Sequence, residues 1–413
     1  MASQVKKLRS KRDKVLSLLL LSVIVGIVAL LQNKYGRLSD IRSFYGMHFF
    51  DGQHLWPFSE KTLIGETKVQ HPVEYPALTG LIMWLLSFLV FSTDTAITDY
   101  YRITAGFQIA LFTLSAYFIF KLVGKKFAFY FILAPAVAYS LNRNWDIWAV
   151  VTMLLAIYFF EKKKFSLSAI LLAISIATKF FPVVLMLPIM IIFIREKQIR
   201  EFLKYVVTTL LSWVVINLPF VLIDFSGWAY FYKFSAERGL GSASIYEITD
   251  IIFPALQFDS IHFYILNLFS LALVTLLLIK LKNTPSLTAV SFFVMFGFIL
   301  FNKQYSMQYV IWLAALAVLS IAQLSKKHRE YFIYVYVAWQ SAEFAFQYAF
   351  YQRILTDAFA NTSTPMSISV SNTTYAYVGV VRYLLAIFFA LLLARLLYIA
   401  DYESNASKKS PIA

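Results

Sequence analysis

Residues 1–31 read MASQVKKLRSKRDKVLSLLLLSVIVGIVALL. Six Lys and Arg residues stand in the first 14 positions, and the run from Val15 to Leu31 that follows has no charged residue. An apolar run of this length spans the hydrocarbon core of a bilayer as a helix. Basic residues before such a helix favour the cytoplasmic side, and no small-residue cleavage site follows the run. We therefore expect an uncleaved first transmembrane helix with its N-terminus in the cytoplasm.

The rest of the chain has the same apolar character. Of its 413 residues, 60% are hydrophobic and 14% are charged, whereas a soluble domain has about 45–50% and about 25%. The net charge is +15. In a membrane protein such an excess of Lys and Arg usually lies in the cytoplasmic loops, so we expect no nucleic-acid partner. The absence of cysteine from the sequence excludes disulfides, thiolate metal ligands and a cysteine nucleophile.

Thirteen apolar runs are candidates for membrane helices, and two of them, 166–178 and 182–194, are too short to span alone. The thirteen runs are 15–31, 77–91, 103–123, 127–141, 146–160, 166–178, 182–194, 205–223, 261–279, 286–301, 309–324, 331–350 and 378–400. If all of them crossed, basic clusters such as Lys162 to Lys164 would lie outside, against the positive-inside rule. The run 77–91 is short and begins after Pro76, so we interpret it as a re-entrant or interfacial helix.

The fold class that follows is an all-α polytopic membrane protein with about 12 transmembrane helices. Most of the 37 Lys and Arg residues then lie on the cytoplasmic side, together with both termini. We expect a single transmembrane domain over residues 1–400 and a disordered cytoplasmic tail over 401–413. The external side receives three long segments, 32–102, 224–260 and 351–377, and two tight turns, 142–145 and 302–308.

The first external segment contains three carboxylates, Asp40, Asp51 and Glu74. A carboxylate beside a membrane face can act as a general base for an alcohol acceptor. Asp40 is the strongest candidate because it lies close to the end of the first helix, with Arg42 and Tyr45 nearby. On the residues alone, a solvated loop aspartate remains the commoner explanation.

Two further polar groups interrupt apolar helices. The turn Asn142-Arg143-Asn144-Trp145-Asp146 either faces a cavity or anchors helix ends at the interface. Lys179 stands at the tip of a hairpin formed by the short runs 166–178 and 182–194. An amine at membrane depth requires an anionic partner, such as a lipid phosphate or an aspartate.

The later external segments join aromatic and polar side chains. Residues 227–239 carry several aromatic rings, Glu237 and Arg238, which suits sugar, isoprenoid and phosphate binding or, equally, an interfacial amphipathic helix. The turn 302–308 groups Asn302, Lys303, Gln304 and Gln308. On run 331–350, Gln340, Glu343 and Gln347 share one helix face, which we interpret first as a packing seam.

Several motifs of nucleotide chemistry are missing from the sequence. It contains no Walker A loop, no dinucleotide glycine fingerprint, no HExxH and no DxD. A nucleotide-driven pump and a nucleotide-sugar enzyme are therefore disfavoured. If a sugar donor exists, we expect it to arrive through the membrane.

Six motifs in order resemble the polyprenyl-phosphate-sugar-dependent glycosyltransferases of family 87, within the wider glycosyltransferase-C fold. They are SDI (39–41), EYPALTG (74–80), NRNWD (142–146), ATKFFP (177–182), FYKFSAERG (231–239) and NKQYSMQYVIW (302–312). The chain departs from that pattern at Arg143, before NWD, and at Tyr305 to Met307, where Ser-Pro is expected. Preference for donor or acceptor is therefore left open by the resemblance.

The resemblance implies inverting transfer of a sugar, often mannose, from a polyprenyl-phosphate donor to a lipid or glycan acceptor. The reaction would occur on the external face of a prokaryotic plasma membrane, in envelope glycan synthesis, without metal or cofactor. Asp40 matches the acidic residue after the first helix and would be the catalytic base. The implied donor-phosphate ligands are Lys179, Arg238, Lys303 and Arg143; the implied sugar or acceptor ligands are Glu74, Tyr75, Asn144, Asp146, Glu237, Gln304 and Gln308.

Two other classes of function fit the same topology. A multi-pass transporter or flippase of a lipid-linked sugar also has many crossings with both termini inside. Transporters tend to have internal repeats and polar sites near the midplane, whereas the polar groups here cluster at the outer ends of the expected helices. A subunit that only holds a lipid-linked glycan is the third alternative, which the sequence alone does not separate from an enzyme.

Overall fold

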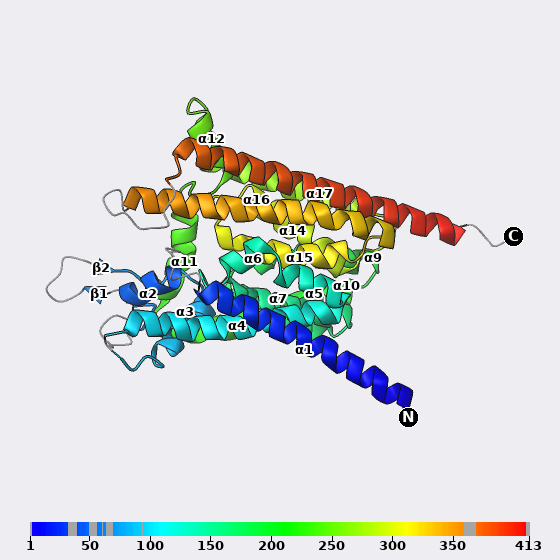
Figure 1. The fold of residues 1–413 in the computed structure, drawn as a ribbon, viewed down its shortest axis with the longest axis horizontal. Coiled ribbons are helices and arrows are strands. Elements are labelled where there is room, and N and C mark those ends of the chain that lie inside the picture. The colour runs from blue at the N-terminus through cyan, green and yellow to red at the C-terminus, as the bar shows by residue number, and fades with distance from the viewer. Residues whose placement is uncertain are drawn as a thin grey trace.

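The computed structural model describes residues 2–31, 39–48, 56–59, 61–62, 69–92, 94–358 and 369–409. Within these ranges the chain is helical, apart from its turns and one antiparallel pair of two-residue strands, β1 (Lys61–Thr62) and β2 (Val69–Gln70). The longer helices lie side by side in one bundle, and both termini lie at the same end of it (Figure 1). Asp51, one of the candidate carboxylates, lies outside the described residues.

Five described helices are long and apolar enough to cross a membrane. They are α1 (Ala2–Leu31), α4 (Ala96–Val123), α10 (Ile199–Ile223), α13 (Ser260–Lys280) and α17 (Asn372–Lys409). Their outward side chains are large and apolar; Leu222 of α10 is 76% exposed and Leu268 of α13 is 71% exposed. Such a surface is stable against lipid and unstable against water. The chain is therefore an all-α membrane protein.

The remaining helices fill the bundle or cap its ends. They are α2 (Asp40–His48), α3 (Ala77–Ser87), α5 (Lys125–Ile132), α6 (Pro135–Ser140), α7 (Asp146–Glu161), α8 (Phe165–Thr178), η3 (Phe181–Leu185), α9 (Met186–Arg195), α11 (Phe225–Glu237), α12 (Ile245–Ile252), α14 (Leu287–Leu300), η4 (Met307–Tyr309), α15 (Val310–Ile321) and α16 (Lys326–Ala358). All residues of α15 are buried, as are nearly all of α14. Helices that are apolar on every face belong in a core, and these two form the centre of the bundle.

Most expected apolar runs coincide with helices, and two expectations are wrong. Run 127–141 is divided into α5 and α6, because Pro135 lacks the amide hydrogen needed to continue a helix and instead begins the next one. The tail after Asp401 was expected to be disordered, but α17 continues to Lys409. The Asp401 carboxylate accepts hydrogen bonds from the backbone of Lys282 and Asn283, which attaches this end of α17 to the end of α13.

The expected short hairpin is present. The rings of Phe165, at the start of α8, and Phe193, near the end of α9, are 4.9 Å apart, so both arms return to the same end of the bundle. Lys179 lies at the turn between α8 and η3. Thr79 of α3 donates a hydrogen bond of 2.5 Å to the backbone oxygen of Thr178. The helix predicted at 77–91 is thereby attached to the tip of the hairpin.

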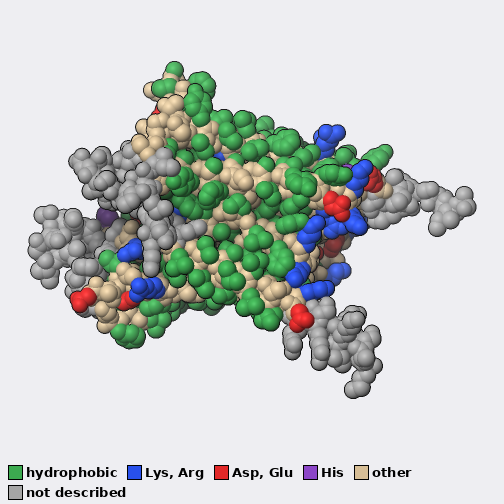
Figure 2. Space-filling model, in the orientation of Figure 1, with side chains coloured by type: hydrophobic (Ala, Val, Ile, Leu, Met, Phe, Trp, Pro, Cys, Tyr) green, Lys and Arg blue, Asp and Glu red, His purple; other side chains and the backbone are tan. Residues whose placement is uncertain are grey.

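Charge divides the bundle into two ends. Lys and Arg side chains gather at the end that carries both termini, while apolar side chains cover the flank (Figure 2). Helices α2 and α11 lie at the other end, with the β1–β2 pair (Figure 1). Asp40 begins α2, Glu74 follows β2 and Arg238 follows α11, and Asn144 is joined to Asp40 by a hydrogen bond.

Close packing of α1 on α4 generates a stability prediction. A Cβ added at Gly26 would lie 2.6 Å from Cγ1 of Ile109, whereas one added at Gly106 would meet no atom within 4 Å. Alanine improves helix propensity by about 1 kcal/mol at either position, but overpacking costs about 1–3 kcal/mol. We expect Gly106→Ala to raise the free energy of unfolding and Gly26→Ala to lower it, measured by denaturant titration in micelles. Equal stability of the two variants would contradict this packing.

Candidate functional site

The turn between α6 and α7 organises the site. Asn142 has a φ of 64°, a left-handed conformation that Asn adopts more readily than most residues. The turn presents backbone oxygens to the residues after α1. The amide of Asp40 donates to the oxygen of Arg143 at 3.0 Å, and the hydroxyl of Ser39 donates to the oxygen of Asn142 at 3.1 Å. Asp40, the first residue of α2, is thus fixed against this turn.

Asn144 connects Asp40 to Tyr75. Its Nδ2 donates to Oδ2 of Asp40 at 2.8 Å and to the hydroxyl of Tyr75 at 2.7 Å. The ring of Tyr75 packs edge-on against Phe44 and Trp145, with centroids 5.5 Å and 5.2 Å away. Aromatic packing holds the Tyr75 hydroxyl in place, and the amide then orients the carboxylate. Asp40 keeps an exposed side chain, so a hydroxyl group from outside can reach it.

The surroundings of Asp40 raise the pKa of its carboxyl group, which favours a role as a proton acceptor. Part of the Asp40 side chain is exposed, but the protein packed around its carboxylate excludes much of the water, and this burial raises the pKa of Asp40 above its ordinary value. The hydrogen bond from Asn144 and the charges of Arg143 and Lys179 oppose this, while Asp146 adds to it. Burial also raises the pKa of Glu74, and the charge of Arg238 opposes it. A carboxylate with a raised pKa is a stronger proton acceptor in its ionised form.

Lys179 has the anionic partner that its depth requires. Its Nζ lies 2.8 Å from Oδ1 of Asp146, and Trp312 donates to the other carboxylate oxygen at 3.1 Å. Asp146 is 1% exposed and Lys179 is 13% exposed, so the amine is the part of this pair nearer to the surface. Its Nζ also lies 4.8 Å from the ring centroid of Tyr75. The pair thereby places a cation beside the group formed by Asp40, Tyr75 and Asn144.

Arg143 is enclosed by aromatic rings. Its guanidinium carbon lies 4.3 Å from the ring centroid of Tyr139 and 3.4 Å from that of Tyr351, and its Nε donates to the Tyr139 oxygen at 3.0 Å. The side chain is 1% exposed. Arg143 therefore contributes a fixed positive charge behind Asp40.

The loop after α11 and the turn after α14 meet at the same end of the bundle. The amide of Gly241 donates to the oxygen of Lys303 at 2.9 Å, and Nζ of Lys303 donates to the oxygen of Ala236 at 3.0 Å. A side chain at position 241 would occupy the place of the Gln304 amide, so any residue other than glycine would have to displace that side chain. Lys303 and Gln304 are both largely buried, and their contacts join the two segments.

The predicted residues therefore fall into one main group and one supporting group. Asp40, Glu74, Tyr75, Asn144, Asp146 and Lys179 form the main group with Arg143, and exposed Arg238 acts on it through its charge on Glu74. Lys303 and Gln304 support the loop that follows Arg238. Glu237 is exposed and Gln308 is buried in η4; within the described part of the chain, no recorded contact joins either to the main group.

A buried ion pair that the sequence analysis missed holds these loops. Nε of Arg382 donates to Oε2 of Glu343 at 2.8 Å, and both side chains are fully buried. Arg382 also donates to the backbone oxygens of Ala243 at 3.2 Å and Tyr305 at 3.3 Å. An arginine in the apolar run 378–400 was the signal available, because an intramembrane charge requires a partner. Glu343 and Gln347, which bonds to Ser140, confirm the expected packing seam.

An apolar groove lies between α3, α8 and α10, and no main-group residue lines it. It has a volume of about 550 Å³ and is lined by α3, α8 and α10 through Leu78, Ile170, Ile174, Leu211, Ser212, Val215 and Ile216. Leu78 lies between Ala77 and Thr79, and Thr79 bonds to the residue before Lys179. One lining residue of the groove is therefore next in the sequence to the residue that contacts the tip of the hairpin. A long apolar chain is the kind of ligand that such a lining suits.

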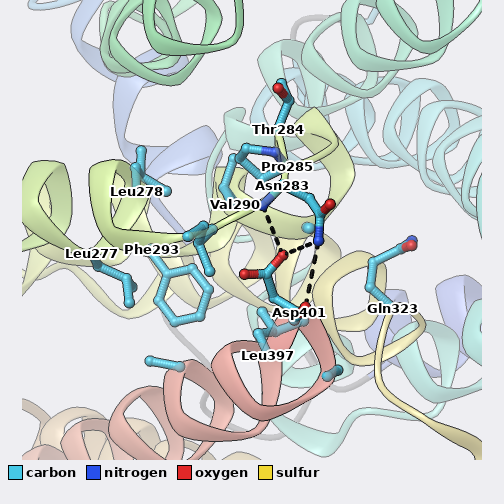
Figure 3. Close-up of a pocket in the computed structure, with 14 residues that line it drawn as sticks. Leu277, Leu278, Asn283, Thr284, Pro285, Val290, Phe293, Gln323, Leu397 and Asp401 are labelled. Carbon is cyan, nitrogen blue, oxygen red and sulfur yellow. Dashed lines mark hydrogen bonds between the residues drawn. The ribbon is translucent and has the colours of Figure 1, made fainter. Parts of the chain in front are cut away.

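A second cavity lies at the other end of the bundle. It has a volume of about 290 Å³ and is lined by the ends of α13, α14 and α17 (Figure 3). Asp401 and Asn283 form a hydrogen-bonded rim to it, with 2.7 Å between Asn283 Nδ2 and the carboxylate. None of the main-group residues lines it. In the described residues, no three His, Asp or Glu side chains are grouped so as to hold a metal ion.

The Arg382–Glu343 pair generates a second prediction. Removing one partner leaves an uncompensated buried charge, which costs about 3–5 kcal/mol. We expect Arg382→Gln to lower the free energy of unfolding by that amount, and the double change to Leu at both positions to cost less than the single change. Arg102→Gln removes the exposed pair with Asp99, 3.2 Å long, and should cost less than about 1 kcal/mol. Denaturant titration in micelles measures all three; equal losses for Arg382→Gln and Arg102→Gln would contradict the larger contribution expected of the buried pair.

Comparison of the chain with known protein families gives no match, and comparison with curated protein sequences gives none. The functional conclusion therefore depends on the residues and on their arrangement.

Proposed function

We propose that this protein is an integral membrane glycosyltransferase that moves a sugar, mannose by resemblance, from a polyprenyl-phosphate donor to an acceptor hydroxyl. One observation carries the proposal: the accessible Asp40 carboxylate and the cation Lys179 both lie against Tyr75 and Asn144 or its neighbours, and the hairpin that ends at Lys179 also lines an apolar groove through α8. A base, a phosphate ligand and a lipid-chain site are the three parts that this reaction needs. The order of the six sequence motifs supports the same function.

In this reaction Asp40 removes the proton of the acceptor hydroxyl. The acceptor oxygen attacks the anomeric carbon while the bond from that carbon to the phosphate oxygen breaks. Inversion follows from a single displacement, through a transition state with oxocarbenium character. The products are the glycosylated acceptor and polyprenyl phosphate, and the proton stays on Asp40 until solvent removes it.

Negative charge develops on the departing phosphate. Lys179 and Arg238 are the two partly accessible cations of the site, and we assign the phosphate to them. Arg143 and Lys303 are buried against rings or backbone oxygens, so we assign them a fixed positive field and a positioning role. Preorganised charges of this kind stabilise a transition state without reorganisation of solvent. Glu74, Glu237, Gln304 and Gln308 remain the proposed sugar or acceptor ligands.

The donor's isoprenoid chain would lie in the groove between α3, α8 and α10. Helix α3 has 11 residues, a length of about 17 Å, against about 30 Å of hydrocarbon. We therefore propose that α3 enters the membrane without crossing it and walls the groove. The hydrogen bond from Thr79 to Thr178 would keep this wall beside Lys179.

The proposed orientation has about 12 crossings, with the site external and both termini cytoplasmic in a prokaryotic plasma membrane. The basic side chains gather at the end with the termini (Figure 2), and the positive-inside rule assigns that end to the cytoplasm. Main-group residues lie at the other end, where α2 and α11 are found (Figure 1). An envelope lipid or glycan is accessible to a site on that side.

The first functional test is transfer of labelled mannose from synthetic polyprenyl phosphate mannose to a lipid or glycan extract. We expect Asp40→Asn to lower the transfer rate by about 10²–10⁴-fold, because a general base contributes that much, while donor binding is retained. Asp99→Asn removes a carboxylate of α4 that pairs with an exposed arginine and should leave the rate unchanged.

Equal rates for wild type and Asp40→Asn would remove Asp40 as the base and point to Glu74. Donor binding without transfer by the wild type, together with movement of the donor across vesicle membranes, would instead establish the flippase alternative. Neither binding nor transfer would overturn the proposed donor class.

The pH dependence of transfer gives a sharper test of the base. Asp40 acts only when ionised, so the rate falls as the pH falls through its pKa, which burial raises above 3.8. The Asn144 hydrogen bond lowers this pKa. We therefore expect Asn144→Leu to move the acid limb of the rate profile to higher pH. Tyr75→Phe leaves the Asn144–Asp40 bond in place and should shift the limb less; an unchanged limb in Asn144→Leu would contradict the assignment.

A further inference from the structure

A hollow lies between α5 and α16, at the basic end of the bundle and away from the candidate site. Its volume is about 230 Å³, and it is lined by Lys126, Phe127, Tyr130, Lys326, Arg329 and Glu330. Three of the six lining side chains are cationic and one is anionic. Helix α5 begins at Lys125 and α16 begins at Lys326, so the hollow lies where both helices enter the bundle.

The positive charge of this hollow is not balanced by the protein. Among the side chains that the structure describes, Lys126, Lys326 and Arg329 form no ion pair. Neither α5 nor α16 has an acidic residue in its first turn, so the helix dipoles add to the positive potential. Three like charges around one hollow repel one another. A bound anion would remove that repulsion.

Aromatic rings form the floor and fix the cations. Nζ of Lys126 lies 5.6 Å from the ring centroid of Tyr130, and the guanidinium carbon of Arg329 lies 6.0 Å from that of Phe127. Phe127 is 6% exposed, so its ring is part of the core. The cations are therefore held over an ordered surface and not on free side-chain ends.

Large apolar and tyrosine side chains are exposed on, or directly after, the two helices that form the hollow. Leu133, directly after α5, is 57% exposed, and Tyr331 and Tyr334 of α16 are 68% and 73% exposed. Tyrosine is enriched where a membrane meets water, and exposed leucine on a membrane protein lies against acyl chains. A ligand here meets cations at the interface and apolar side chains next to them. A soluble anion would use only the first of these two features.

We propose that this hollow binds the phosphate headgroup of an anionic phospholipid, whose acyl chains lie along the exposed faces of α5 and α16. Arg329 offers a planar fork of donors to the phosphate oxygens, and Lys126 and Lys326 offer point charges from either side. Binding would link the starts of the two helices through one headgroup and stabilise their packing. This site requires nothing of the sugar-transfer reaction.

The test uses the full chain purified in a neutral detergent. Phosphatidylglycerol, or phosphatidylcholine with the same acyl chains, is titrated, and the apparent affinity is measured from the rise in melting temperature and by native mass spectrometry. We expect phosphatidylglycerol to bind more tightly to the wild type. The double variant Lys126→Gln/Arg329→Gln should weaken that binding roughly 30-fold, because two phosphate contacts are lost.

A matched double variant, Lys162→Gln/Lys164→Gln, removes the same charge from exposed residues of the α7–α8 turn and should bind phosphatidylglycerol like the wild type. Arg329→Lys keeps the charge and tests whether a loss reflects folding alone. Equal affinity for the two lipids, or equal losses in both double variants, would overturn the site. Equal stabilisation by glycerol phosphate without acyl chains would overturn the lipid assignment in favour of a free phosphate.

Discussion

A charge inside an apolar helical bundle must have a partner, and two buried ion pairs satisfy this constraint here. Lys179 and Asp146 join the end of α8 to the start of α7, and Glu343 and Arg382 join α16 to α17. In each pair, groups that the ion pair does not use form further hydrogen bonds. Trp312 completes the first pair, and backbone oxygens of two loops complete the second. An isolated charge in such surroundings is costly, and Arg143 is accommodated by the rings of Tyr139 and Tyr351. In the two ion pairs, the contacts that make the charges tolerable also hold the loops.

Asp40 is held in a different way, and the difference bears on its proposed role. Its oriented oxygen accepts from a neutral amide, that of Asn144, and the nearest cations act on it through their charge alone. Asp146, by contrast, is buried and in direct contact with the ammonium group of Lys179. Asp40 keeps an accessible surface, and the burial of its carboxylate raises its pKa. Asp40 and Asp146 both adjoin the turn between α6 and α7 and thus differ in use: Asp146 holds a cation in place, and Asp40 remains accessible to a hydroxyl group.

Much of this arrangement could be predicted from the sequence because membrane helices have a strong apolar signal. The runs, the hairpin at 166–194 and the need of Lys179 for an anionic partner all followed from hydropathy and charge. What the sequence could not supply was which distant groups meet. Asp40 contacts the backbone of a turn more than a hundred residues away, and Arg382 pairs with Glu343 across 39 residues. Pro135 is a signal for a helix break, but the run 127–141 is apolar on both sides of it, and hydropathy alone therefore predicts one continuous helix.

The two ends of the bundle solve opposite electrostatic problems. At the site end, Lys179 is held in place by its ion pair with Asp146 and remains partly accessible, and exposed Arg238 lies close enough to act on Glu74. At the end with the termini, cations are numerous and several have no acidic partner among the described residues (Figure 2). A phosphate at the site end would contact a few cations held in fixed positions. A phosphate at the end with the termini would be attracted by the summed charge of many cations. The first arrangement suits a donor that must be recognised and released, whereas the second suits anionic lipid that stays in place and fixes the orientation of the protein.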